Sequence, residues 1–160
     1  MAKAREIPEL AQPVSFRDAA AVTVEVRAAE LFGHSDGVLD TGDIERVHDM
    51  RVATRRLRAA LEIFEPCFPK KEFKQALKDV KALADALGER RDPDVHIAEL
   101  ERIRRSLTRE DGPGVRSLEE ELRAQQSAGN DALSRKLREI EDTRLRERLD
   151  ALVAAARSTA

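Results

Sequence analysis

The chain has 160 residues, which is enough for one domain with a sizeable buried core. Its formal net charge is -2 and only 3% of its residues are aromatic, which argues against a generally basic nucleic-acid binder and against recognition of single strands by base stacking. A site for an anion must therefore be a local patch. The prevalence of Ala, Leu, Glu and Arg predicts an all-α protein, which we expect to be an antiparallel helical bundle with a four-helix-bundle core and additional helical segments.

Residues 1–12 show no clear apolar periodicity and are expected to be a flexible lead-in to one helical domain spanning residues 13–158. A first helix is predicted over residues 15–32, because apolar residues recur there at helical spacing and Gly33 follows them as a stop. The Gly-containing segment at residues 34–42 is predicted to be a loop.

The second predicted helix begins near Asp43 and ends before Pro66, and two stripes of different chemistry run along it. The first stripe has the three-and-four spacing of a buried bundle seam, and it consists of Val47, Met50, Thr54, Leu57, Leu61 and Phe64. The second stripe has the same spacing and lies roughly 110° around the helix. Its members are His48, Arg51, Arg55 and Arg58.

The second stripe needs an explanation, because like charges along one line of a helix cost about 0.2–0.5 kcal/mol per pair. One interpretation is that acids on other helices neutralise the arginines. The other is a platform for a polyanion with regularly spaced phosphates, since a guanidinium presents a fixed fork of donors to phosphate oxygens.

A third helix is predicted from Pro69 to Leu87, with Gly88 closing it. It also has a basic stripe beside its apolar seam, formed by Lys71, Lys74, Lys78 and Lys81. The short turn before it should make the second and third helices antiparallel neighbours. Their basic stripes form one surface if they lie on the same side, and otherwise they are two unrelated solvated faces.

The junction after the third helix contains Asp92 followed by Pro93, which predicts a new helix start because an aspartate caps free amides and proline suits the first turn. We therefore expect a fourth helix up to about residue 108, followed by a loop at residues 111–114.

A fifth helix is predicted over residues 115–140, where Gly129 and Asn130 are candidates for a kink. Thr143 is expected to cap a final helix that ends near Arg157.

The sequence contains no P-loop, no Gly-rich dinucleotide fingerprint and no HExxH, and we expect no enzymatic activity. A di-metal carboxylate bundle would carry Glu-x-x-His on two helices, and we expect neither a metal site nor a cofactor. The single cysteine, Cys67, is expected to be an inert thiol. No apolar run is long enough to cross a membrane, so we expect a cytoplasmic protein.

Two segments resemble the signatures of the CHAD family, the conserved histidine α-helical domain. The first reads His48-x-x-Arg51-Val52-x-x-Arg55-Arg56-x-Arg58-x-x-Leu61. The second runs from Lys81-Ala82-Leu83 through Leu87-Gly88 to Arg91-Asp92-x-Asp94-Val95. The two follow one another in the family's order and at about its separation, and the helical layout of residues 15–157 is compatible with it.

The resemblance implies a non-catalytic module that binds inorganic polyphosphate through a basic surface and is associated with polyphosphate granules. The positions that it assigns to polyphosphate binding are His48, Arg51, Arg55, Arg56, Arg58, Lys74, Lys78, Lys81 and Arg91. Asp92 matches as well and is expected to be a cap, while Arg91 either binds phosphate or holds the junction.

The chain departs from the family pattern in one respect. The family typically has two such bundles, and the sequence holds only the N-terminal type of repeat. One hypothesis is that two copies pair as a homodimer and restore the two-bundle arrangement. The alternative function is a helical scaffold or interaction protein whose basic stripes bind an acidic partner or another phosphate-rich polyanion.

Overall fold

The computed structural model describes residues 3–158, which form helices joined by short loops and contain no strand. The five α-helices are α1 (Phe16–Gly33), α2 (Ile44–Ile63), α3 (Lys70–Ile103), α4 (Gly112–Asp142) and α5 (Leu145–Ser158). Short 3-10 helices are η1 (Pro8–Ala11), η2 (Glu65–Cys67) and η3 (Arg104–Ser106). The predicted all-α bundle is confirmed.

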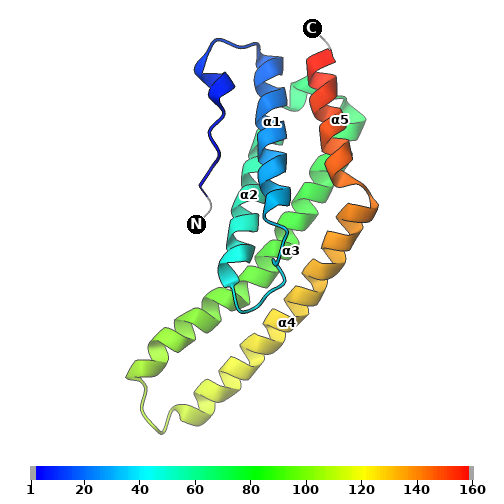
Figure 1. The fold of residues 1–160 in the computed structure, drawn as a ribbon. Helices are drawn as coiled ribbons and strands as arrows, with labels where there is room; N and C mark the ends of the chain where they lie inside the picture. Colours follow the sequence, from blue (N-terminus) through cyan, green and yellow to red (C-terminus); the bar gives the residue numbers. More distant parts are fainter. Residues whose placement is uncertain (1–2, 159–160) are drawn as a thin grey trace.

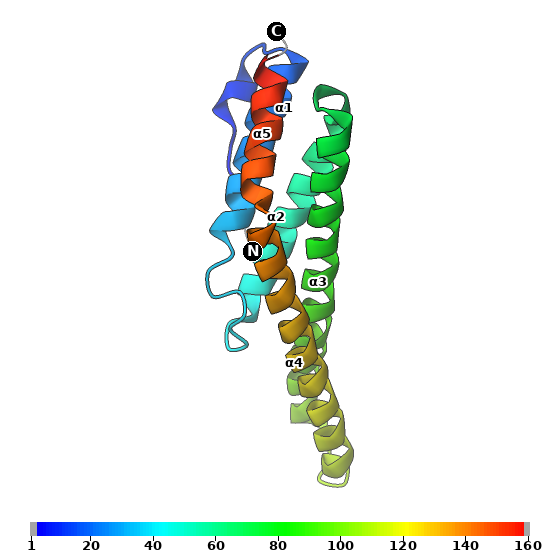
Figure 2. The same cartoon turned by 90° about the vertical axis from the view of Figure 1, so that its right-hand side faces the viewer.

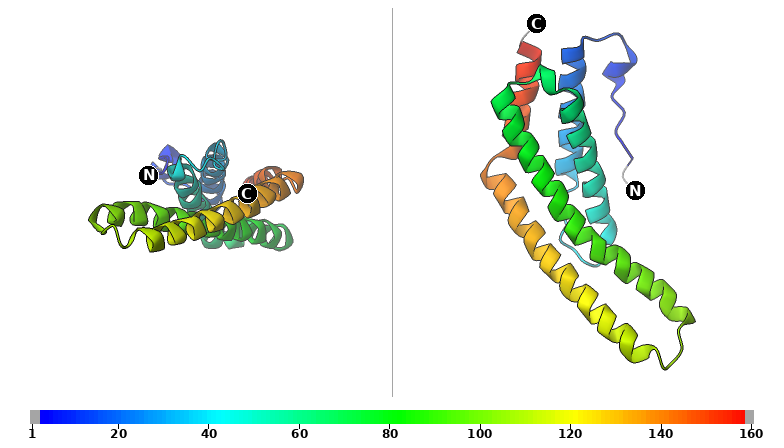
Figure 3. Two further views of the ribbon diagram at one scale, coloured as in Figure 1. Left: turned by 90° about the horizontal axis from the view of Figure 1, so that it is seen from below. Right: turned by 180° about the vertical axis from the view of Figure 1, so that it is seen from behind.

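The helices α1, α2 and α5 pack together with the first half of α3, and α3 then continues beside α4 as a long hairpin (Figure 1). The far end of this hairpin projects beyond the other helices (Figures 2 and 3). The largest fully buried apolar side chains are Leu31, Met50, Leu57, Leu61, Phe73, Leu83, Leu87, Leu133, Leu145, Leu149 and Leu152. The core therefore lies where the helices converge, and α2 and α3 each keep one flank at the surface.

Local signals set the ends of α1 and α2. The Oγ atom of Ser15 accepts a hydrogen bond of 3.0 Å from the Asp18 backbone N–H, which caps α1 at its start. The following loop turns at Gly37, whose φ of 67° is easily adopted only by glycine. α2 ends at Ile63, before Pro66. The predictions for these two helices are confirmed to within about two residues.

The predicted break after the third helix is wrong, because α3 runs without interruption through Gly88, Asp92 and Pro93. Asp92 is therefore not an N-cap. A proline inside a helix removes one hydrogen bond and crowds the preceding turn, which costs about 3 kcal/mol. Packing of this segment offsets the cost, since Pro93 and Asp94 are both buried and Asp94 accepts a hydrogen bond from Gln126 of α4.

A buried polar network joins α3 to α4 beside the proline. Arg90 and Asp94 are 0% and 1% exposed and form an ion pair. Gln126 of α4 donates a 2.7 Å hydrogen bond to Asp94, and Arg90 donates one of 3.0 Å to Asn130. The Asn130 side chain in turn donates to the carbonyl of Leu39 at 3.0 Å, which attaches the α1–α2 loop to the hairpin.

The fifth predicted helix appears as α4, which continues through Gly129 and Asn130 as a single helix. Gly129 is buried because α3 passes close to it. A Cβ atom added there would lie 3.1 Å from Arg90 Cα and 3.3 Å from the carbonyl oxygen of Glu89. The glycine thus permits close packing of two helices, and it does not interrupt its own helix.

The expected cap of the final helix is also wrong. Thr143 is the C-cap of α4, and its backbone N–H donates to the carbonyl of Glu139. Arg144 makes the turn into α5 with a φ of 51°, and α5 begins at Leu145.

Two glycine substitutions are expected to change the free energy of unfolding in opposite directions. Gly88→Ala meets no atom within 4 Å and should stabilise α3 by about 0.5–1 kcal/mol, because alanine is the better helix former. Gly129→Ala should destabilise the protein by about 1–2 kcal/mol, because its Cβ presses on the α3 backbone. Urea denaturation measures both, and equal stabilisation by the two changes would contradict the close approach.

Residues 3–15, which precede α1, contact the bundle through Arg5. The Arg5 backbone N–H donates to the buried carboxylate of Glu30, and Arg27 donates to the Arg5 carbonyl at 3.1 Å. Arg27 also donates a 2.8 Å hydrogen bond to the Glu30 carboxylate. Burial alone would raise the pKa of Glu30, but the hydrogen bonds it accepts from Arg5 and Arg27 and the charges of Arg27 and Arg56 hold it below its ordinary value. The boundary between the lead-in and the domain stays a prediction.

Candidate anion-binding surface

The apolar stripe of α2 is buried, as its spacing predicts. Five of its members are buried and one is half-buried: Val47, Met50, Thr54, Leu57 and Leu61 in the core, and Phe64 at its edge. The Thr54 hydroxyl donates to the Met50 carbonyl at 2.8 Å, so its polar atom is satisfied in the seam. Burial of this stripe fixes the rotation of α2, and the basic stripe consequently lies at the edge of the core.

The members of the basic stripe differ in exposure. His48 and Arg51 are half-buried, whereas Arg55 and Arg58 are exposed. Within residues 3–158, no carboxylate lies within ion-pairing distance of Arg51 or Arg55. These two guanidinium groups are therefore free of internal acids, contrary to the interpretation that other helices neutralise the whole stripe.

The lysine stripe lies on the first half of α3, which returns antiparallel to α2 after the short η2 turn (Figure 1). Lys74 and Lys78 are exposed and Lys81 is half-buried. Neither Lys74 nor Lys78 has an acidic partner among the described residues. The lysines are thus available at the surface on the helix adjacent to the arginines.

One acid connects the two helices. The Glu62 carboxylate accepts a 3.1 Å hydrogen bond from Arg58 Nε, and the same Oε1 atom lies 3.2 Å from Lys81 Nζ. The hydrogen bond from Arg58, together with Lys81, holds the pKa of Glu62 below its usual value, so it is charged at neutral pH. Because one oxygen contacts cations of both helices, the two stripes approach each other on the same side at this point.

Arg91 holds the start of α2 against α3. Its guanidinium donates to the Ile44 carbonyl at 3.2 Å and lies 3.6 Å from the Glu45 carboxylate. The side chain is only 16% exposed. Of the two roles that the sequence left open, this geometry corresponds to holding the junction.

A comparison of the sequence with models of protein families identifies the kind of domain. The family model described as CHAD domain matches residues 23–160, which is nearly the whole chain. The chain belongs to the CHAD family. Searches of curated proteins and of solved structures give no match. Among the described residues of this CHAD domain, no helix has the length and apolar character needed to span a membrane.

Arg56 lies apart from the other matching arginines of this CHAD domain. It is half-buried, and its charge acts on Glu30 of α1. The structure therefore does not bring Arg56 together with the stripe that faces α3.

The basic surface of the CHAD domain also contains acids. A shallow hollow on α3 is lined by Lys74, Lys78 and Lys81 but also by Asp85. Glu62 and Asp85 both follow a basic stripe at helical spacing, which is a signal that the sequence contains. The contact of Glu62 with Lys81 of the neighbouring helix is visible only in the folded domain.

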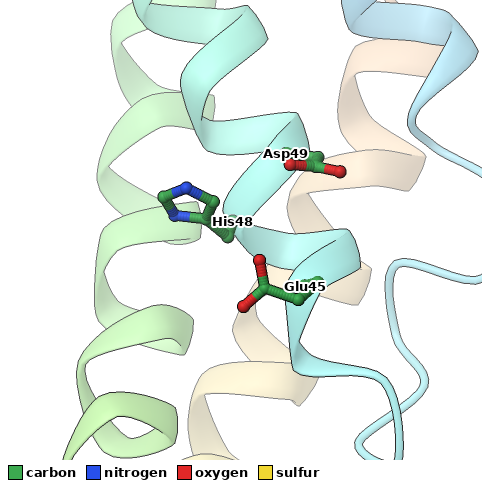
Figure 4. A group of neighbouring side chains, drawn as sticks. All are labelled: Glu45, His48 and Asp49. Atoms are coloured by element: carbon green, nitrogen blue, oxygen red, sulfur yellow. The ribbon is translucent and has the colours of Figure 1, made fainter. Parts of the chain in front are cut away.

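Glu45, His48 and Asp49 form a small group on the first turns of α2 (Figure 4). Each offers one ligand atom, and these atoms lie within 4.8 Å of one another. Glu45 stands three residues before His48, so the chain carries the Glu-x-x-His spacing once, which our expectation of no metal site overlooked. All three residues come from one helix, and Glu45 lies 3.6 Å from the Arg91 guanidinium, so one of the three carboxylate and imidazole groups already has a cationic partner.

Proposed function

We propose that this CHAD domain binds inorganic polyphosphate, without catalysing a reaction, across the basic stripes of α2 and α3. The observation that carries the proposal is the bridge from Arg58 through Glu62 to Lys81, because it brings an arginine of one stripe next to a lysine of the other. The family association supports the same ligand.

The residues of the two stripes would act in different ways. Arg51, Arg55 and Arg58 are spaced by three or four residues, so their side chains follow one another along the helix at intervals of about 5–6 Å. Each guanidinium can donate two parallel hydrogen bonds to one phosphate group. The lysines would act as point charges, and His48 would donate one hydrogen bond, more strongly when protonated.

A single bundle offers only a short row of cationic side chains, and a long polyanion binds more tightly when a second row is available to it. We therefore propose that two copies associate as a homodimer, and that the domain is located on polyphosphate granules in the cytoplasm. Light scattering in solution tests the homodimer, because the mass of a monomer at working concentrations would contradict this part of the proposal.

The binding proposal is tested by titrating the protein with polyphosphate of one defined length at two salt concentrations. We expect the affinity to fall by roughly a hundredfold between about 50 and about 200 mM salt, by analogy with counterion release from nucleic acids. Duplex DNA and an acidic peptide serve as competitors. Preference for the acidic peptide would support the scaffold function instead, and equal binding of all three would show general attraction to anions.

A further inference from the structure

Glu62 has an unusual position for an acid, because it lies inside the surface proposed to bind an anion. Its Oε1 atom is 3.1 Å from Arg58 Nε and 3.2 Å from Lys81 Nζ. The three side chains are 43%, 44% and 42% exposed, so a ligand in solution can reach all of them.

The two ion pairs contribute little to folding, because water screens exposed charges and the long side chains lose entropy when they are held. The position of the Glu62 carboxylate oxygen nevertheless indicates what can bind there. A negatively charged oxygen is held there by cations from two helices, and an oxygen of a phosphate group can make the same contacts.

We propose that Glu62 takes the place of a phosphate oxygen in the free domain, and that bound polyphosphate displaces it from Arg58 and Lys81. The inference rests on the proposed function and adds a competing residue to that site. It also identifies where a bound chain would cross from α2 to α3.

Competition by Glu62 would favour long anions over short ones. A single orthophosphate at this position gains only the two cations that Glu62 already contacts. A polyphosphate chain reaches further cations that have no internal acid, among them Arg55 on α2 and Lys78 on α3. Each added contact between the ligand and a cation offsets the loss of the two ion pairs of Glu62, so the domain binds long polyphosphate chains more tightly than short ones.

The test measures fluorescence anisotropy of labelled polyphosphate at low salt with the full chain. Glu62→Gln keeps the shape of the side chain and removes its charge, and we expect it to tighten binding by about threefold to tenfold. Glu120→Gln is the matched control, since it removes one exposed acid from α4, outside the two basic stripes, and it should change the affinity by less than about twofold.

A double variant of the two cations provides a second test. If Arg58 and Lys81 are both changed to glutamine, the effect of Glu62→Gln should disappear, because the coupling requires its partners. Unchanged or weaker binding by Glu62→Gln, or equal tightening by Glu120→Gln, would overturn the competition while the proposed function stands. Absence of polyphosphate binding by the unaltered domain at low salt would overturn the proposed function itself.

Discussion

Reversing the charges of Arg51 and Arg55 together is expected to reduce the affinity of the CHAD domain for polyphosphate by about 100-fold or more. Both guanidinium groups lack an internal acid within the described residues, so both are available to a ligand. Two glutamates would replace forked donors with groups that repel phosphate. Isothermal titration calorimetry with polyphosphate of defined length measures the loss.

The matched control for this prediction is the double reversal of Arg135 and Arg138. These two arginines are exposed, lie close together on one helix as Arg51 and Arg55 do, and have no acidic partner among the described residues. They belong to α4, outside the proposed surface, and the net charge changes by the same amount. The control should bind polyphosphate within about fivefold of the unaltered protein. An equal loss in both variants, with both folded by circular dichroism, would refute a local site.

The second large effect concerns stability. Asp94→Ala is expected to lower the free energy of unfolding by about 3–5 kcal/mol, because it leaves the buried guanidinium of Arg90 without its counter-charge. Gln126 also loses its acceptor on Asp94. Urea denaturation followed by circular dichroism measures the change.

A neighbouring aspartate provides the control for Asp94. Asp92 lies on the same helix but is exposed, and Asp92→Ala should change the free energy of unfolding by less than about 0.5 kcal/mol. A comparable loss from both substitutions would contradict the special role of the buried network. Retained stability in Asp94→Ala would contradict the contribution of the network to the α3–α4 hairpin.

The parts of the fold that are set by residues close together in the sequence could be predicted from the sequence. Ser15 caps the start of α1, Gly33 is its last residue as predicted to within one position, and the apolar spacing of α2 correctly predicted its buried face. The continuity of α3 could not be predicted, because Asp92 and Pro93 locally favour a new helix. Packing against α4, with its buried Gly129 and Gln126, outweighs that preference, and the partners are more than thirty residues away.

The same distinction applies to the candidate site. The sequence identified which cations share a stripe, because helical spacing is sufficient for that. It did not predict that Glu62 would contact Lys81 of the next helix, or that Arg91 would bind the Ile44 carbonyl. Helical spacing already left Arg56 outside the stripe, but the action of its charge on Glu30 of α1 is visible only in the folded domain.

The location of the bound ligand is tested most directly by nuclear magnetic resonance. Polyphosphate of one defined length is titrated into isotope-labelled protein, and the shifts of backbone amides and arginine side-chain Nε–H groups are followed. We expect shifts at Arg51, Arg55 and Arg58 and at the lysines of α3, with little change in α5 or in the projecting end of the hairpin. Shifts centred on α4 or α5, or a response limited to one of the helices α2 and α3, would contradict a surface shared by the two.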